Sequence, residues 1–189
     1  MPVGDAAGRR QARRGEGVRT HRIPAADSGV VAMDYQINFD SRTSAAALAE
    51  VLATRYRVEP SRIYIGGSAG LGDYGGPAPT VLLSPAPAPD PRFGCLLRAG
   101  PALSRHIGGL SGVGLAEELC RELGTHALVA GGATGWTLVT SDGRTCEAVI
   151  DDDLFAEEGF VLVAVLSPMP RLPEVPVRSS HWRTGRFAR

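Results

Sequence analysis

The chain of 189 residues is long enough for one domain with its own core, and its 43% hydrophobic and 21% charged residues are typical of a soluble globular protein. Its formal net charge of zero divides into +3 for residues 1–32, −7 for residues 33–167 and +4 for residues 168–189. The negative body disfavours nucleic acid as a partner, and the longest unbroken apolar run, Phe160–Leu166, is too short to cross a membrane. We therefore expect a cytoplasmic protein.

The composition divides the chain in the same way, and from it we predict three parts. Residues 1–32 form an Arg-, Gly- and Ala-rich arm without helical or strand periodicity, which we expect to be disordered. Met33 opens the first regular pattern, which makes it an alternative start of translation. Residues 33–167 form a small acidic domain, and residues 168–189 form a flexible tail rich in Pro and Arg.

The first half of the domain begins with a strand and a helix. Apolar and polar residues alternate in residues 33–39, and this period of two indicates a half-buried strand. Residues that favour N-caps precede an Ala-rich helix over about 45–57. Its inward stripe consists of Leu48, Val51, Leu52 and Tyr56. The elements expected next are a strand over 62–65, a Gly-rich loop over 66–79, a strand over 80–84, an extended proline-rich linker and a strand over 92–98.

The second half contains one more predicted helix and the remaining strands. Ser111 caps a helix over about 113–123, and Gly124 suits the left-handed residue that ends it. The pair Asp142-Gly143 predicts a hairpin turn. The run Phe160–Leu166 is apolar at every position, so we expect it to be covered on both faces as the central strand of the sheet. The other expected elements are a loop over 101–110 and strands over 127–130, 136–140 and 144–150.

Together these elements predict an α+β fold, with a single mixed sheet of about seven to eight short strands and two helices on one face. The chain also echoes itself. LAEVL at Leu48–Leu52 corresponds to LAEEL at Leu115–Leu119, and each of these segments is followed by a short strand and a Gly-Gly pair. The echo suggests a weak internal βαββ repeat.

One motif points directly to a chemistry. Residues 66–70, Gly-Gly-Ser-Ala-Gly, match G-x-S-x-G directly after a predicted strand. With the preceding residues they read VEPSRIYIGGSAG, which locally resembles the nucleophile elbow of α/β-hydrolase esterases and depolymerases. The resemblance implies a serine hydrolase with Ser68 as the nucleophile. A nucleophile elbow opens a helix, whereas the sequence that follows, LGDYGGPAP, favours a plain flexible turn.

The remaining residue types that bind metals or react are scattered along the chain. Cys95, Cys120 and Cys146 lie 25 and 26 residues apart, without the close pairing of a zinc or redox site, so we expect buried free thiols. His106 and His126 have no second ligand at metal spacing. No phosphate-loop or dinucleotide fingerprint occurs. We therefore expect neither a metal nor a cofactor.

Five carboxylates lie within eight residues of one connection between two late strands, and no Arg occurs between Arg144 and Arg171. An acidic surface steers association towards a basic one. We therefore favour a non-catalytic protein-interaction module, comparable to immunity or adaptor proteins, that binds a basic protein. The alternatives are a solvated turn at this connection and an esterase-like hydrolase that uses Ser68. The expected partner-binding residues are Asp151, Asp152, Asp153, Glu157 and Glu158.

Overall fold

The structure is a computed structural model of the whole chain, which divides into two units, residues 1–30 and residues 31–189. Every described residue belongs to the second unit. The predicted arm and the loop around Ser68 lie outside the described residues. The structure describes residues 35–66, 76, 78–86, 93–131, 135–151 and 160–179.

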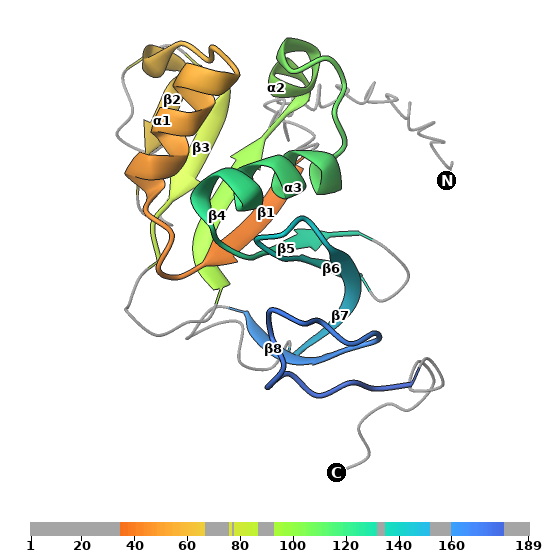
Figure 1. Cartoon of the computed structure of the whole chain (residues 1–189). Helices are drawn as coiled ribbons and strands as arrows, with labels where there is room; N and C mark the ends of the chain where they lie inside the picture. The colour runs from red at the N-terminus through yellow and green to blue at the C-terminus, as the bar shows by residue number, and fades with distance from the viewer. Residues whose placement is uncertain are drawn as a thin grey trace, which may run out of the picture. The chain divides into compact units, whose positions relative to one another are not determined.

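The second unit has the predicted α+β fold, built on one mixed sheet (Figure 1). In the described residues the helices are α1 (Ala45–Arg55), α2 (Pro101–His106) and α3 (Gly112–Leu123), with a 3₁₀ turn at Pro60–Arg62. The strands are β1 (Tyr35–Asp40), β2 (Ile63–Ile65), β3 (Val81–Ser84), β4 (Phe93–Ala99), β5 (Ala127–Ala130), β6 (Trp136–Val139), β7 (Thr145–Asp151) and β8 (Val161–Val165). None of the described helices is long and apolar enough to span a membrane.

The eight strands follow the order β2-β3-β4-β1-β5-β6-β7-β8. β2 and β3 pair in parallel, and every other neighbouring pair is antiparallel. Strand β1 therefore lies inside the sheet, between β4 and β5. The predicted hairpin is confirmed, because β6 and β7 are joined by the turn that contains Asp142 and Gly143.

The main core lies between the sheet and two helices on one face, as predicted. The alternation in β1 places Tyr35, Ile37 and Phe39 on this face, and all three are buried. The helices α1 and α3 contribute apolar stripes with the spacing of a helix that packs on one side. The stripe residues with no exposed surface are Leu48 and Leu52 of α1 and Leu115, Ala116, Leu119 and Cys120 of α3.

A second core covers the other face of the sheet at β5 to β8. Leu128 and Leu138, whose side chains are fully buried, belong to it, whereas their neighbour Val129 faces the helices. Met169 and Val175 close this core from beyond the last strand, with 5% and 7% exposure. The folded chain thus continues past residue 167, where the Pro- and Arg-rich composition predicted a flexible tail to begin.

The predicted position of Phe160–Leu166 is wrong, because β8 lies at an edge of the sheet and not at its centre. Its outer side is covered by the end of the described chain: Val165 N–H donates to Pro176 O (2.9 Å) and Arg178 N–H donates to Val165 O (2.8 Å). A run that is apolar at every position indicates cover on both faces. Here Met169 and Val175, from beyond the last strand, supply part of that cover.

The predicted loop over 101–110 is also partly wrong, because its first six residues form α2. Pro101 occupies the first turn, where the fixed backbone angle of proline favours a helix and its missing N–H has no intrahelical partner to lose. Leu103 is fully buried and anchors the turn to the main core. One buried position is too few to establish a helical period, so periodicity could not reveal this helix.

The sequence echo does not extend to the strand pairing. After α1 the chain forms β2, which pairs in parallel with β3, whereas after α3 it forms β5, which pairs antiparallel with β6. The short connection between β5 and β6 suits a hairpin, and the longer one between β2 and β3 permits parallel pairing. The echo therefore extends to the order of the elements, a strand, a helix and two further strands, but not to how the last two strands pair.

Candidate functional site

Most of the residues predicted to act in function lie outside the described residues. These are Ser68, Asp152, Asp153, Glu157 and Glu158. Asp151 is described and ends β7, where it lies opposite Val161 of β8. The strand before Ser68, β2, lies at the edge of the sheet, and the next strand that the structure describes is β3.

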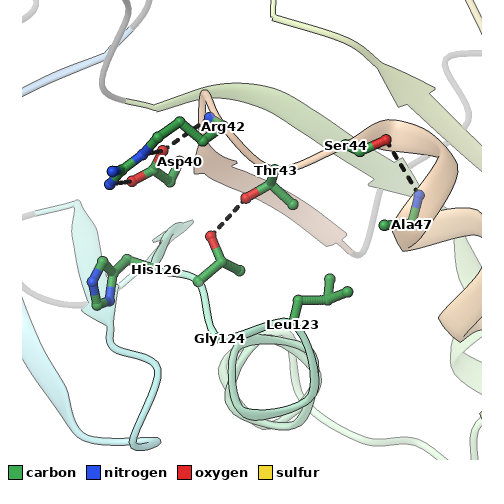
Figure 2. A pocket seen from close by; sticks show the side chains of 9 residues that line it. Asp40, Arg42, Thr43, Ser44, Ala47, Leu123, Gly124 and His126 are labelled. Carbon is green, nitrogen blue, oxygen red and sulfur yellow. Dashed lines mark hydrogen bonds and ion pairs between the residues drawn. The ribbon is translucent and has the colours of Figure 1, made fainter.

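A polar cavity lies elsewhere, where two strand–helix junctions meet (Figure 2). The antiparallel pairing of Phe39 with Ala127 brings the end of β1 beside the start of β5, and Asp40 N–H donates to His126 O (3.0 Å). The start of α1 and the end of α3 complete the walls. The cavity has a volume of about 380 Å³ and is lined by Asp40, Arg42, Thr43, Ser44, Ala47, Leu123, Gly124, Thr125 and His126.

Asp40 and Arg42 form an ion pair in one wall of this cavity (Figure 2). Asp40 Oδ1 accepts from the backbone N–H of Arg42 (2.9 Å) and from its Nε (3.1 Å), and Oδ2 accepts from Nη2 (2.9 Å). Burial alone would raise the pKa of Asp40, but the hydrogen bonds and charge of Arg42 outweigh it and lower the pKa below its ordinary value. Asp40 is therefore ionised at neutral pH, with both oxygens occupied.

Hydroxyl groups line the wall between the two helices. Thr43 Oγ1 and Thr125 Oγ1 share a hydrogen bond of 2.6 Å, which ties the start of α1 to the end of α3 (Figure 2). Ser44 caps α1 by accepting from Ala47 N–H at 3.4 Å. The first turn of α1 contains no acidic residue, so its positive end is not compensated by its own side chains.

His126 is half-buried at the start of β5 (Figure 2). Its Nδ1 lies 3.2 Å from the backbone N–H of Ser141, which donates to it. Burial lowers the pKa of His126 and outweighs the attraction of the Asp40 carboxylate. The imidazole is therefore neutral at pH 7, with Nδ1 as acceptor and the proton on Nε2.

A second polar cluster joins the helices on their outer side. Glu118 of α3 accepts from Tyr56 Oη (2.7 Å) and from Arg55 Nη2 (3.1 Å). Burial, followed by the bond to Glu118, raises the pKa of Tyr56. His106 Nε2 lies 2.7 Å from the carbonyl oxygen of Tyr56, at the end of α1. These bonds connect three helices, so we interpret the cluster as structural.

The three cysteines are free and buried, as predicted. Burial raises the pKa of Cys95 to about 11 and that of Cys120 to about 12, so neither thiol ionises near pH 7. Cys146 Sγ accepts from the backbone N–H of Ser167 (3.1 Å). Within the described residues no three His, Cys, Asp or Glu side chains cluster in a way that could hold a metal ion.

Sequence reasoning identified parts of the cavity without joining them. The residues that favour N-caps before the helix over 45–57 include Asp40, Thr43 and Ser44, and His126 directly precedes the predicted strand over 127–130. The bond from Arg42 N–H to Asp40 Oδ1 is a local Asp turn that the sequence Asp-Ser-Arg could have indicated. His126 lies beside Asp40 because β1 pairs with β5. No local sequence pattern predicts this pairing.

Comparison with protein-family models, curated proteins and solved structures finds no match to this chain. The fold and the cavity thus define only a class: an α+β protein with a mixed sheet, two helices on one face and a polar cavity at two strand–helix junctions.

Proposed function

We propose that the protein is a non-catalytic interaction module that binds a basic surface of a partner protein through the acidic connection, residues 151–158. The observation that carries this proposal is the pairing at the two ends of the connection. Asp151 pairs with Val161, and Phe160 N–H donates to Phe93 O (3.3 Å), so folded strands hold both ends. In the sequence, residues 151–158 contain five carboxylates, and the paired strands β7 and β8 flank this connection.

The state of the described nucleophiles and bases supports a non-catalytic role. The thiols of Cys95 and Cys120 are buried, and burial raises their pKa. His126 accepts from a backbone N–H, and the ring of His106 binds a backbone carbonyl group. Both imidazole rings therefore stabilise the backbone conformation through these hydrogen bonds. Three free thiols also suit the reducing cytoplasm that we assign to the protein.

The test is the rate at which a basic partner, isolated by pull-down, associates with charge variants. The triple change D152N/D153N/E157Q should slow association several-fold at low salt, because steering depends on local charge. Added salt should slow the wild type in the same way. The matched control E50Q/E59Q/E174Q removes three exposed carboxylates from other parts of the fold and should change the rate less.

Two outcomes would contradict the proposal. A partner that associates with the triple variant at the wild-type rate at low salt would exclude the acidic connection as the docking surface. Covalent labelling by a fluorophosphonate that disappears in Ser68→Ala would show a serine hydrolase, the alternative that the sequence motif suggested.

A further inference from the structure

The described sheet has two edge strands, β2 and β8. At β8 the chain itself adds an extended segment to the outer side, where Val177 pairs with Val165. At β2 the neighbour in the described sheet is β3, and the opposite side of the strand faces outwards. We propose that this outer edge of β2 pairs with the same edge of a second copy of the chain, in a weak antiparallel dimer centred on Ile65.

The backbone of β2 directs the main-chain groups of Ile65 outwards. In a parallel ladder the N–H and C=O groups of one residue lie on the same side of the strand, and successive residues alternate between the two sides. Gly66 N–H donates to Leu83 O of β3 (3.0 Å), so Gly66 and Tyr64 face β3. Both main-chain groups of Ile65 therefore point away from β3, where another extended strand can pair with them.

The side chain of Ile65 supports the same surface. It is 44% exposed, and Ile65 and Val177 are the exposed large hydrophobic residues of the described chain. β2 consists of Ile63, Tyr64 and Ile65, without a charge or a proline, and its register with β3 is regular. Charges, prolines and bulges are the features by which proteins prevent edge strands from pairing. The described residues of β2 thus leave this edge open to another strand.

Two identical edges fit each other in one register. Ile63 N–H is already used, because it donates to Pro60 O at the end of the 3₁₀ turn. A pairing of Ile63 with the second copy's Ile65 would therefore lack part of its hydrogen bonds. When Ile65 lies opposite its own counterpart, each N–H donates to the C=O of the other, and the two exposed side chains lie side by side on one face. A second copy thus satisfies the main-chain groups and covers the apolar side chain at once.

The size of the surface sets the strength of the dimer. Each copy contributes one strand of three residues, whereas a standard stable interface buries about 800 Å² on each partner. Association also costs translational and rotational freedom. We therefore expect a dissociation constant on the order of 100 µM, so that the dimer forms where the protein is concentrated.

The experiment is sedimentation equilibrium of the full chain at concentrations from about 10 µM to about 1 mM, in about 0.15 M sodium chloride, which screens the attraction between the basic ends of one copy and the acidic domain of another. We expect the average mass to rise with concentration from that of the monomer towards that of the dimer, and no further.

Two charge variants test the register. Ile65→Lys and Ile65→Glu each place like charges directly opposite each other in the dimer, so each variant alone should lose at least tenfold in affinity. An equal mixture of the two variants places opposite charges there and should associate again. The matched controls, Val177→Lys and Val177→Glu, change the other exposed large hydrophobic residue and should leave the dimer unchanged, alone or mixed.

A proline variant tests the main-chain bonds. Ile65→Pro removes an N–H that does not face β3, so it should leave the pairing of β2 with β3 in place. The dimer loses both hydrogen bonds between the two copies of Ile65, since each is donated by this N–H, and should weaken at least tenfold.

The proposal is overturned if the full chain stays monomeric over this range, or if the mixture of Ile65→Lys and Ile65→Glu, both with folded spectra, associates no better than either alone. It is also overturned if the mass grows beyond the dimer and Val177→Lys stops this growth, because the edge of β2 would then pair with the opposite edge of the next copy. The dimer uses β2, whereas the acidic connection starts at the end of β7, so this test and that of the interaction module succeed or fail separately.

Discussion

The imidazole of His126 is held neutral by two features of its surroundings. Burial disfavours its charged form, and Nδ1 can accept from Ser141 N–H only while that nitrogen carries no proton. The negative charges of three nearby carboxylates raise the pKa of His126: Asp40, Asp142 and Glu174. The positive charge of Arg42 lowers this pKa, as burial does. The pKa of His126 in the folded protein is therefore below its ordinary value of 6.5.

This lowered pKa predicts how stability depends on pH. The unfolded chain binds the proton of this histidine more readily than the folded one, so stability is full above pH 6.5 and is lost as pH falls through the folded pKa. His126→Asn keeps an acceptor for Ser141 N–H but does not titrate. The wild type should thus lose more stability than the variant between pH 7.5 and 5.5, measured by urea unfolding. Equal losses would show that His126 titrates alike in both states.

Single residues with a local role could be predicted from the sequence. Ser111 caps α3 by accepting from Gly114 N–H (3.0 Å), and Gly124 ends it with a φ of 63°, as expected for a cap and a left-handed residue. The end of α1 was less accurate. Arg57 adopts a φ of 56° there, and the helix ends at Arg55, two residues before the predicted end at residue 57. A non-glycine residue in this conformation carries no sequence signal.

At the scale of elements, residues 168–179 help to close the second core and cover the edge strand β8, a role that their composition did not indicate. Residues 168–179 contain no regular element, yet Met169 and Val175 are buried in the second core. Their backbone neighbours Pro176 and Arg178 bond to Val165 at the outer edge of β8. An edge strand with an apolar face needs such a cover to remain soluble and correctly paired.

A chain that ends at Ser167 should therefore be clearly less stable. It loses two buried side chains and exposes the second core, and burial of this size contributes roughly 3 kcal/mol. A chain that ends at Ser179 keeps both side chains and should match the wild type in urea unfolding. Equal stability of the two truncated chains would show that the segment adds nothing to the fold.

The positions of the helices and strands along the chain were more predictable from the sequence than the pairing of the strands in the sheet. Strand β1 and the helices α1 and α3 follow from periodicity, because their apolar residues recur at the spacing of a strand or a helix. The order of the strands does not, since β1 pairs with β4 and β5, which lie far along the chain. The cavity depends on these pairings, so its residues could be named from sequence but not assembled.

At the scale of the whole molecule, the cavity and the start of the acidic connection belong to different strands of the sheet. The described cavity lies between the ends of β1 and α3, whereas Asp151, the first residue of the acidic connection, ends β7. Between them the sheet buries apolar side chains on both faces. Changes at one place should therefore be independent of changes at the other.

The remaining prediction concerns residues 1–32. They lack an apolar stripe that could pack, and the chain divides after residue 30 into separate units. Their net charge of +3 is opposite in sign to the −7 of residues 33–167, so electrostatics favours a weak attraction between the two at low salt. A chain that starts at Met33 should keep the thermal midpoint of the full chain at about 0.15 M salt, where this attraction is screened.

A fall in the thermal midpoint of more than about 4 °C corresponds to more than about 1 kcal/mol and would mean that the arm packs on the domain. A fall that appears only at low salt would instead identify the charge attraction.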